Sequence, residues 1–356
     1  MKLLYLTHCN WNSIKQRPHF LAESLNIKNK EVHVSYKWSP KKYNYSENKT
    51  FLKLFPCLFA PFSLLKFKLF FLLDSFFWKY FFYFLNGIYN YRYVIVTHPL
   101  LYRYTTEMKS KIIFDCCDDN QLFYKKGKLK DLIKTENIKF LSNSDLNIFS
   151  SENLFNIYKK NGKKNLLVRN AHSINLVNKK NSKNVLKRKS SEIFNIFYFG
   201  TVSSWFDTSI IKTVLKEIHN VKFTIIGPID SIKIKDDRVE YVGPMEHDKL
   251  LNFSTKANAF IMPFIVNDLI KSVDPVKLYE YLTFKVPVIS VYYPEINFFE
   301  EFVNFYSNKK QLIGLVKNII DNETINKSIL KKRHKFLIKN SWKYRSSQIT
   351  NALQKL

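Results

Sequence analysis

The 356-residue chain is poor in glycine, cysteine and acidic side chains, with 7 Gly, 4 Cys and 29 Asp and Glu. It contains no GxGxxG and no GxxxxGK[ST], so a nicotinamide or flavin dehydrogenase and a P-loop nucleotidase are both disfavoured. HExxH, GxSxG and metal-spaced groups of Cys and His are also missing, which argues against a zinc protease, an α/β-hydrolase and a zinc site.

The four cysteines form no CxxC pair, and the adjacent Cys116 and Cys117 have poor geometry for a bridge between elements. This usage favours a reducing, cytosolic compartment. At the N-terminus, the short apolar run of MKLLYLTHCNWNS meets His8 and Asn10 at once. It therefore predicts a first strand and not a signal peptide.

Basic and aromatic side chains are abundant. The chain has 57 Lys and Arg, a formal net charge of +28, 32 Phe and 21 Tyr. With 46% hydrophobic residues it is too apolar for a disordered chain, and its length suggests two domains. The charge attracts polyanions, which include nucleic acid, an anionic membrane surface and phosphorylated substrates.

Short apolar strands alternate with helices, which predicts parallel sheets. In the first half we expect strands at 2–7, 31–37, 93–98, 111–115, 146–150 and 165–170, and helices from near Pro18, at 131–144 and at 151–160. In the second half we expect strands at 193–200, 222–227, 239–243, 259–264 and 286–293, and helices at 208–219, 246–254, 275–284, 309–321 and throughout 324–356. The polar, basic segment 176–193 between the halves predicts a linker.

Segment 51–85 concentrates phenylalanine and interrupts it with lysine. Its longest uncharged run is too short for the roughly 20 residues of a membrane-spanning helix. One interpretation is an interfacial segment with its aromatics among lipid headgroups and its lysines toward anionic lipid. The alternative is a pair of helices buried in the first domain.

The strongest candidate site lies in the second half. Gly200, Gly227 and Gly243 each end a predicted strand, where glycine permits either a close approach to a ligand or a simple sharp turn. Asp274 suits a helix N-cap and Pro275 the first helical position, so the following helix would offer free N–H groups to an anion. Lys277 and Glu280 share one side of that helix; they face a ligand or form an internal ion pair.

The segment SVDPVKLYEYLTFKVPVIS, from Ser272, resembles the nucleotide-sugar signature of retaining glycosyltransferases of the GT-B fold, the family 4 group. Further similar segments follow in collinear order over nearly the whole chain: NWNSIKQRPHFLAESL, IIFDCCDDNQLF, SDLNIFSSENLFN, VRNAHSINL, FYFGTVSSWFD, FTIIGP, VEYVGPMEHDKLLNF, ANAFIMPF and NSWKYRSSQI. Three positions depart from the family pattern, at Ser272, Lys285 and the loop 201–205.

This resemblance implies an α/β chain with two Rossmann-like parallel-sheet domains that face each other across a cleft. It divides the chain into 1–175, an acceptor-binding, membrane-facing domain; the linker 176–193; 194–338, a nucleotide-sugar domain; and 339–356, a helix that crosses back to the first domain. It also implies site roles. Glu280 would hold the ribose, and Lys277 with the amides near Asp274 and Pro275 the diphosphate. The remaining residues implied are Gly200 and Thr201 at the phosphates, Asn267 and Lys271 at the donor sugar, Gln16, Arg17 and His19 from the first domain, and Asp118 or Asp119 at the acceptor hydroxyl.

The implied activity is transfer of a sugar, with retention, from a UDP- or GDP-linked donor to a lipid-linked or glycan acceptor in surface-polysaccharide biosynthesis. Lys277 and Asp118 would be catalytic, and neither a cofactor nor a metal is expected. The enzyme would be cytoplasmic and peripheral at the inner face of an anionic membrane. Two alternatives stay open: another GT-B reaction such as hydrolysis or epimerisation of a nucleotide-sugar, and a basic nucleic-acid-binding protein. No nucleic-acid motif is visible, which weighs against the second.

Overall fold

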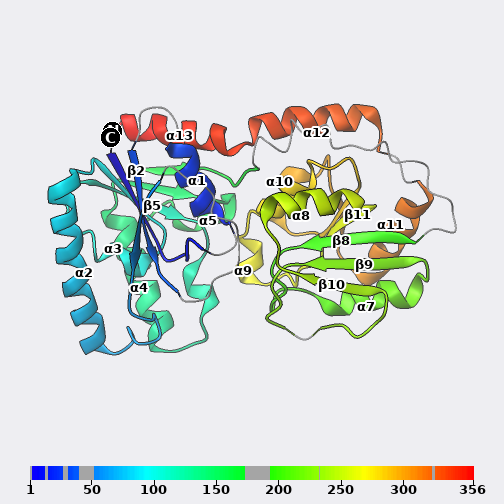
Figure 1. Cartoon of the computed structure of the whole chain (residues 1–356), viewed down its shortest axis with the longest axis horizontal. Helices are drawn as coiled ribbons and strands as arrows, with labels where there is room; N and C mark the ends of the chain where they lie inside the picture. Colours follow the sequence, from blue (N-terminus) through cyan, green and yellow to red (C-terminus); the bar gives the residue numbers. More distant parts are fainter. Residues whose placement is uncertain are drawn as a thin grey trace. The chain divides into compact units, whose positions relative to one another are not determined.

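The structure is a computed structural model that describes residues 2–12, 15–26, 31–39, 52–172, 193–231, 233–322 and 325–356. The chain forms two compact units, shown with their elements in Figure 1. Unit 1 contains Met1–Asn170, Ser272–Asp274 and Trp342–Leu356, and unit 2 contains Ala171–Lys271 and Pro275–Ser341. The predicted linker, apart from its last residue, lies outside the described residues.

Unit 1 is built on a parallel sheet of seven strands in the order β3-β2-β1-β4-β5-β6-β7. The strands are β1 (Lys2–Thr7), β2 (Glu31–Lys37), β3 (Lys53–Cys57), β4 (Tyr93–Val96), β5 (Lys111–Cys116), β6 (Leu146–Phe149) and β7 (Asn165–Leu167). The helices are α1 (Arg17–Leu25), α2 (Lys68–Tyr89), α3 (Pro99–Tyr102), α4 (Lys128–Asn143), α5 (Glu152–Tyr158) and α13 (Trp342–Gln354), with the 3-10 turn η1 (Asn120–Phe123).

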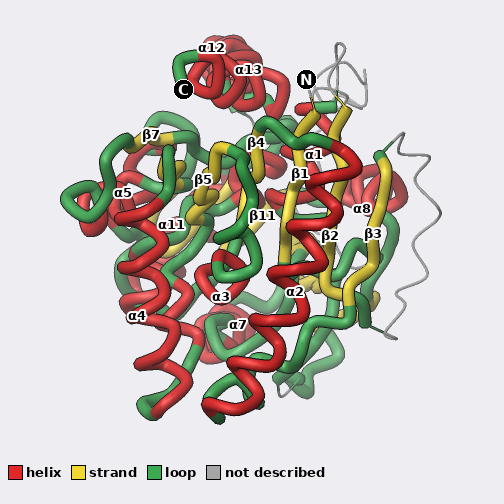
Figure 2. Tube along the Cα trace, turned by 90° about the vertical axis from the view of Figure 1, so that its left-hand side faces the viewer, coloured by secondary structure: helices red, strands yellow, loops and turns green. Residues whose placement is uncertain are grey.

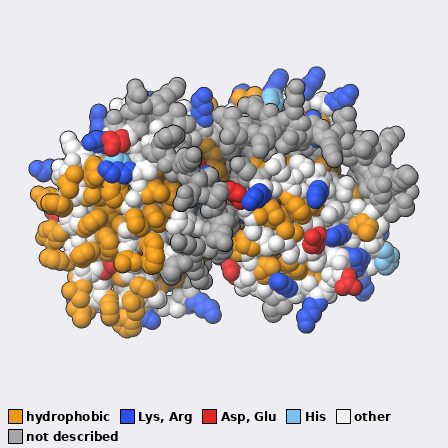
Figure 3. Space-filling model, in the orientation of Figure 1, with side chains coloured by type: hydrophobic (Ala, Val, Ile, Leu, Met, Phe, Trp, Pro, Cys, Tyr) orange, Lys and Arg blue, Asp and Glu red, His pale blue; other side chains and the backbone are white. Residues whose placement is uncertain are grey.

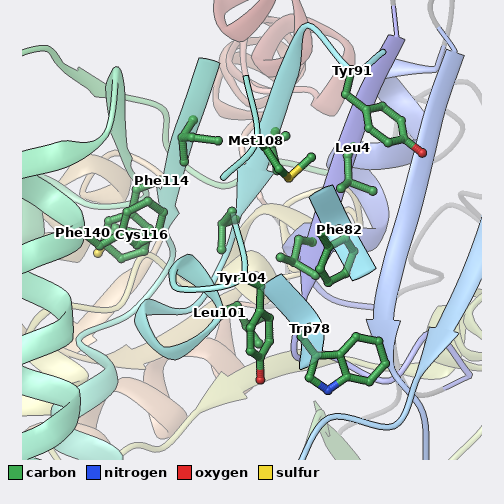
Figure 4. Packing of buried hydrophobic residues seen from close by; sticks show 14 of the residues in the cluster. Leu4, Trp78, Phe82, Tyr91, Leu101, Tyr104, Met108, Phe114, Cys116 and Phe140 are labelled. Carbon is green, nitrogen blue, oxygen red and sulfur yellow. The ribbon is translucent and has the colours of Figure 1, made fainter. Parts of the chain in front are cut away.

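One face of this sheet carries the main core of unit 1. Successive side chains of a strand point to opposite faces, so register decides which residues meet. Leu4 of β1 pairs with Val94 of β4, and Val96 pairs with Phe114 of β5. These residues pack with Phe82 of α2 and with side chains of α3, α4 and α5 in one buried cluster (Figure 4). In Figure 2, α2 and α4 run over this side of the sheet.

The other face of the sheet is covered by helices from both ends of the chain. Phe20 of α1 stacks on Trp342 of α13, with ring centroids 5.3 Å apart. The Tyr93 hydroxyl donates to the carbonyl of Leu353 at 2.7 Å. The predicted return of the C-terminal helix to the first domain is therefore confirmed.

The structure of segment 51–85 contradicts one of the two interpretations of its sequence. The segment forms the edge strand β3 and most of the 22-residue helix α2, so the predicted pair of buried helices is wrong. Only Trp78, Phe82 and Leu85 of α2 are buried hydrophobic residues. The seven-stranded sheet offers this helix one flank, so its other aromatic side chains remain outside the core. No helix in the described part of the chain is long and apolar enough to cross a membrane.

Unit 2 is built on a parallel sheet of six strands in the order β10-β9-β8-β11-β12-β13. The strands are β8 (Phe194–Phe199), β9 (Val221–Ile226), β10 (Val239–Gly243), β11 (Ala259–Met262), β12 (Val288–Val291) and β13 (Asn304–Tyr306). The helices are α7 (Thr208–Glu217), α8 (His247–Phe253), α9 (Asp268–Lys271), α10 (Val276–Tyr281), α11 (Lys309–Asp321) and α12 (Lys327–Lys339), with the 3-10 turns η2 (Ser254–Lys256) and η3 (Pro294–Phe299).

Aromatic rings join the helices of unit 2 to its sheet. Phe260 of β11 stacks on Tyr281 of α10 with centroids 4.6 Å apart, and Phe197 of β8 lies 5.8 Å from Phe253 of α8. The two predicted parallel-sheet α/β domains are thus confirmed. The predicted continuous C-terminal helix is wrong, because Asn340 and Ser341 separate α12 from α13.

Candidate functional site

Each sheet has a point where its strand order reverses, and ligands of open parallel sheets bind beyond the carboxyl ends of the strands at such a point. In unit 1 the reversal lies between β1 and β4, and in unit 2 between β8 and β11. The residues that follow these four strands are therefore the first candidates.

In unit 2, Gly200 directly follows β8 and lies against Lys277 of α10. Its φ is +146°, and a Cβ added to it would lie 1.9 Å from Cε and 2.9 Å from Nζ of Lys277. The lysine ammonium thus rests on the glycine backbone, where no side chain separates them. This arrangement places a positive charge at the reversal point of the sheet.

Gly227, at the end of β9, completes the same small region. Its φ is +136°, and an added Cβ would lie 2.2 Å from the carbonyl oxygen of Gly200. Both glycines have a conformation that side chains disfavour. In addition, a Cβ at Gly227 would meet the backbone of Gly200, and a Cβ at Gly200 would meet the side chain of Lys277. Gly243 also has a positive φ, of +80°, but no atom lies within 4 Å of its added Cβ.

The electrostatics of this region follow from burial. Burial lowers the pKa of Lys277, and the nearby Glu280 carboxylate raises it and offsets part of that effect. Glu280 itself is buried at 7% exposure. A half-buried ammonium beside a glycine turn suits an anionic group of a ligand.

The capping roles predicted at the start of α10 are wrong. The N-cap of α10 is Pro275, with no side-chain cap, and the helix has six residues. Asp274 belongs to unit 1, where its carboxylate accepts from the Asn170 N–H at 2.6 Å and lies 3.9 Å from Arg169. Because these groups already satisfy the carboxylate, it does not turn back to cap the helix. The positive charge of the predicted anion site therefore comes mainly from Lys277 and less from the helix dipole.

The other predicted donor residues of unit 2 lie near the same strand ends. Thr201 follows Gly200, and its carbonyl accepts from the Tyr198 hydroxyl at 2.9 Å. Asn267 is exposed, and its side chain accepts from the Ile270 N–H. Lys271 pairs with Asp268 at 3.0 Å on the surface of α9. Asn267 and Lys271 are thus engaged in the short helix α9 and are not gathered around Lys277 by any described contact.

In unit 1, Asp118 and Asp119 follow β5. Burial raises the pKa of Asp118 to about 6, the neighbouring Asp119 and Asp115 carboxylates add to this, and Arg17 opposes it. Asp119 is more deeply buried and accepts from the Gln121 amide at 3.3 Å. Asp118, which is half-buried, is therefore the better candidate for proton transfer near neutral pH.

The predicted acceptor-side residues of α1 have three different environments. Arg17 is 4% exposed and forms an ion pair with Asp115, Nη2 to Oδ1 2.8 Å. His19 is stacked on Trp11, and burial lowers its pKa to about 4. Gln16 is exposed, and its side chain accepts from the Cys9 thiol at 3.4 Å. Of the three, only Gln16 presents its side chain at the surface.

The sequence interpretation missed a group of residues at the reversal point of unit 1. His8 follows β1, and Thr97 and His98 follow β4. The two imidazole centroids are 4.8 Å apart, and the Thr97 hydroxyl lies 3.4 Å from Nδ1 of His8. Burial lowers the pKa of His8 to about 4 and also lowers the pKa of His98 well below its usual value, so both rings are neutral near pH 7. Their place after the first and fourth strands was the signal that could have found them.

The chain, with its two parallel-sheet units, is similar to solved structures over its whole length. Sucrose-phosphate synthase from Thermosynechococcus elongatus is similar with a TM-score of 0.74 and 14% identity, covering 100% of this chain and 99% of its own. HepE of Anabaena in complex with UDP and glucose gives 0.71 and 12%, with both chains fully covered. The lipopolysaccharide outer core galactosyltransferase WaaB gives 0.66 and 13%, again with full coverage.

The fold is GT-B. No family model matches the chain, and no curated protein matches its sequence. At 12–14% identity these neighbours establish the fold alone, and the GT-B chain's own residues must carry any assignment of function. In the described part of the chain, no group of three or more His, Cys, Asp and Glu is placed to hold a metal ion.

Proposed function

We propose that this GT-B chain transfers a sugar from a UDP- or GDP-linked donor to a lipid-linked or glycan acceptor. The observation that carries the proposal is the Lys277 ammonium held over Gly200 at the strand reversal of unit 2. The neighbour HepE was solved with UDP and with UDP-glucose, which supports a nucleotide-sugar as the donor class.

On the donor side, Lys277 would neutralise the diphosphate as it leaves. The Gly200 and Val202 amides already donate to the carbonyls of Ile226 and Pro228. The Thr201 amide between them can donate to the same phosphates, since the glycine before it carries no Cβ and permits their approach. Glu280 can accept two hydrogen bonds from the ribose diol. The bond between the anomeric carbon and the phosphate oxygen breaks, and its electron pair stays on the diphosphate, where the ammonium stabilises it.

On the acceptor side, we assign Asp118 the task of orienting and deprotonating the acceptor hydroxyl. Its pKa of about 6 leaves it ionised at pH 7 and able to accept a proton. The hydroxyl oxygen forms the new bond to the anomeric carbon on the face that the diphosphate leaves. This gives retention without a covalent enzyme intermediate, and the cationic side chain replaces a metal.

We further propose a place for this activity in surface-polysaccharide biosynthesis, at the inner face of an anionic membrane. A lipid-linked acceptor is held at the membrane surface, and a formal charge of +28 favours peripheral binding to anionic lipid. The likeness to the galactosyltransferase WaaB agrees with such a role.

The direct test is thermal unfolding with UDP, GDP and their sugar conjugates. A ligand at about 100 times its dissociation constant stabilises a protein by about 2.7 kcal/mol, so one nucleotide class should raise the midpoint clearly. We expect Lys277→Ala and Glu280→Ala to lose this stabilisation. The exposed Lys256→Ala and Glu301→Ala in the same unit should keep it.

Several outcomes would contradict the proposal. Full nucleotide stabilisation in both Lys277→Ala and Glu280→Ala would remove the site assignment. Release of UDP or GDP from the donor at the same rate with and without acceptor would indicate hydrolysis. Salt-dependent binding to random DNA, with no response to any nucleotide, would favour the nucleic-acid alternative.

A further inference from the structure

The outward face of α2 is apolar along its whole length. Among the described residues, more than half of the exposed large hydrophobic side chains lie between Leu58 and Ile88. In Figure 3 they form a continuous hydrophobic area over the part of unit 1 where Figure 1 places α2. The most exposed members on the helix, each 58–69% exposed, are Leu69, Leu73, Phe76, Phe77, Phe84 and Ile88.

The charges of α2 are distributed in the opposite way to those of a helix that faces water. Its one acidic residue, Asp74, points inward, where its carboxylate accepts from Arg103 and from the Ala60 N–H at 3.1 Å. Lys79 lies at the flank and pairs with Glu107 at 2.7 Å. A surface helix normally turns its polar side outward, so α2 is adapted to an apolar neighbour on its outer side.

The apolar surface of this face is large enough to indicate a binding partner. Aromatic side chains offer about 150–250 Å² each. The eight exposed aromatic side chains between Phe67 and Phe84, together with the exposed Leu and Ile side chains of the same segment, therefore amount to on the order of 1,000 Å² of apolar surface. Patches on soluble monomers rarely exceed a few hundred Å², and larger ones mark protein or membrane contacts.

Positive charge at both ends of the face indicates which neighbour covers it. Lys66 and Lys68 are exposed at the N-terminal end of α2. At the C-terminal end, the Lys53 ammonium lies 4.4 Å and the Lys2 ammonium 6.0 Å from the ring centroid of Tyr89. An apolar strip bounded by lysines is complementary to acyl chains bounded by anionic headgroups. A second copy of this chain would instead bring the same lysines against one another.

We propose that the outward face of α2 inserts into the interfacial layer of an anionic lipid bilayer, with the helix axis parallel to the membrane plane. The 22-residue helix is about 33 Å long. Its Phe and Leu side chains enter the boundary between headgroups and acyl chains, and the lysines at both ends contact lipid phosphates. This assignment names the contact surface in unit 1 and holds independently of sugar transfer.

The test is flotation of the full chain with phosphatidylcholine vesicles, with and without phosphatidylglycerol. We expect the native chain to float with the anionic vesicles. Phe76→Ser/Phe84→Ser should bind these vesicles at least about tenfold more weakly, because two exposed rings are removed from the apolar face. The matched pair Ile157→Ser/Ile338→Ser removes exposed apolar side chains of α5 and α12 and should bind as the native chain does.

A second set of variants reports how deeply α2 inserts and how far binding depends on its lysines. In the Phe76→Trp variant we expect quenching by brominated acyl chains beyond that of the native chain. Lys66→Glu/Lys68→Glu should lower binding to anionic vesicles at low salt and leave α2 folded, as read by circular dichroism.

Native-like flotation of Phe76→Ser/Phe84→Ser, or no flotation of the native chain at low salt, would overturn the proposal. A native dimer that this variant dissociates, without lipid binding, would overturn it in favour of a second copy. Nucleotide stabilisation separates it from the proposed function. Failed flotation with intact nucleotide binding counts against α2 alone, and the reverse result counts against sugar transfer alone.

Discussion

At the scale of single residues, the position of Lys277 in the proposed donor site depends on the absence of a side chain at residue 200. The Lys277 side chain occupies the space where a Cβ of residue 200 would lie, 1.9 Å from its Cε. A glycine at this strand end therefore does two things: it permits a φ of +146° and it lets a cation rest on the backbone.

Gly200→Ala should lower the free energy of unfolding by about 1–3 kcal/mol, since it adds backbone strain and displaces Lys277. Gly243→Ala is the matched control, because its φ is also positive but no atom meets the added Cβ. Chemical denaturation measures the loss of unfolding free energy, and nucleotide titration measures the loss of affinity that follows from displacing Lys277. Equal loss of nucleotide affinity in both variants would show that the contact with Lys277 is irrelevant.

Asp118 makes a pH-dependent contribution to stability that can be measured. Its folded pKa of about 6 lies above the ordinary 3.8, so ionisation costs more in the folded state. The cost is absent below pH 4, grows as the pH rises to 6 and is then constant at about 2–3 kcal/mol.

Asp118→Asn removes this cost. We expect it to raise the thermal midpoint at pH 8 and to leave it unchanged at pH 4. The exposed Asp237→Asn should leave the midpoint unchanged at both pH values. If Asp118 is also the base for the acceptor, the variant loses turnover although it gains stability. A midpoint gain of equal size at both pH values would refute the burial of this carboxyl.

At the scale of elements, α1 is attached to β5 by a buried ion pair. The Arg17 guanidinium donates to Asp115 and to the Val168 carbonyl at 2.8 Å, and the Tyr5 hydroxyl donates to the same carboxylate at 2.7 Å. The ion pair joins the first helix to β5, the strand that Asp118 follows.

Removing one partner leaves the other as an uncompensated buried charge. Arg17→Met should therefore destabilise the chain by about 3–5 kcal/mol, and Asp115→Leu likewise. The double variant Arg17→Met/Asp115→Leu should recover much of that loss. Denaturation of the four species gives the coupling energy; additive losses in the double variant would exclude a coupled pair.

The same elements show where prediction from sequence succeeds and fails. The short apolar run 2–7 and the alternating segment 31–37 predicted β1 and β2 with correct bounds, because the pattern of a strand is a local property. Strand β3 was missed, since its core contacts come from pairing with β2 and not from its own pattern. Helix α10 was predicted over 275–284 but spans only Val276–Tyr281. Its buried residues Leu278 and Tyr281 pack against the sheet of unit 2, so tertiary packing and not the local pattern sets its extent.

At the scale of the whole molecule, unit 1 is closed by the last residues of the chain. Ile349 and Leu353 of α13 are fully buried, and Trp342 stacks on Phe20. The fold of unit 1 thus depends on contacts between residues more than 300 positions apart.

Trp342→Ala should cost about 3–5 kcal/mol, as large-to-small changes in a core do. Hydrogen exchange should show the loss in β1, α1 and β4, while β8, β9 and β11 of unit 2 keep their protection. Tyr344→Ala, which removes an exposed ring of the same helix, is the control. A uniform loss of protection in both units would mean that they unfold as one.

Local sequence patterns specify the alternation of strands and helices, and with it the two parallel-sheet units, because periodicity and burial are encoded locally. The sequence also singled out Gly200, Lys277 and Glu280, since their spacing relates to strand ends and helix turns. Tertiary contacts, in contrast, are what place Asp274 in unit 1, bury Arg17 against Asp115 and bring His8 next to His98. These contacts join distant segments, and which face of α2 stays uncovered depends on how much core the sheet offers, which no local pattern contains.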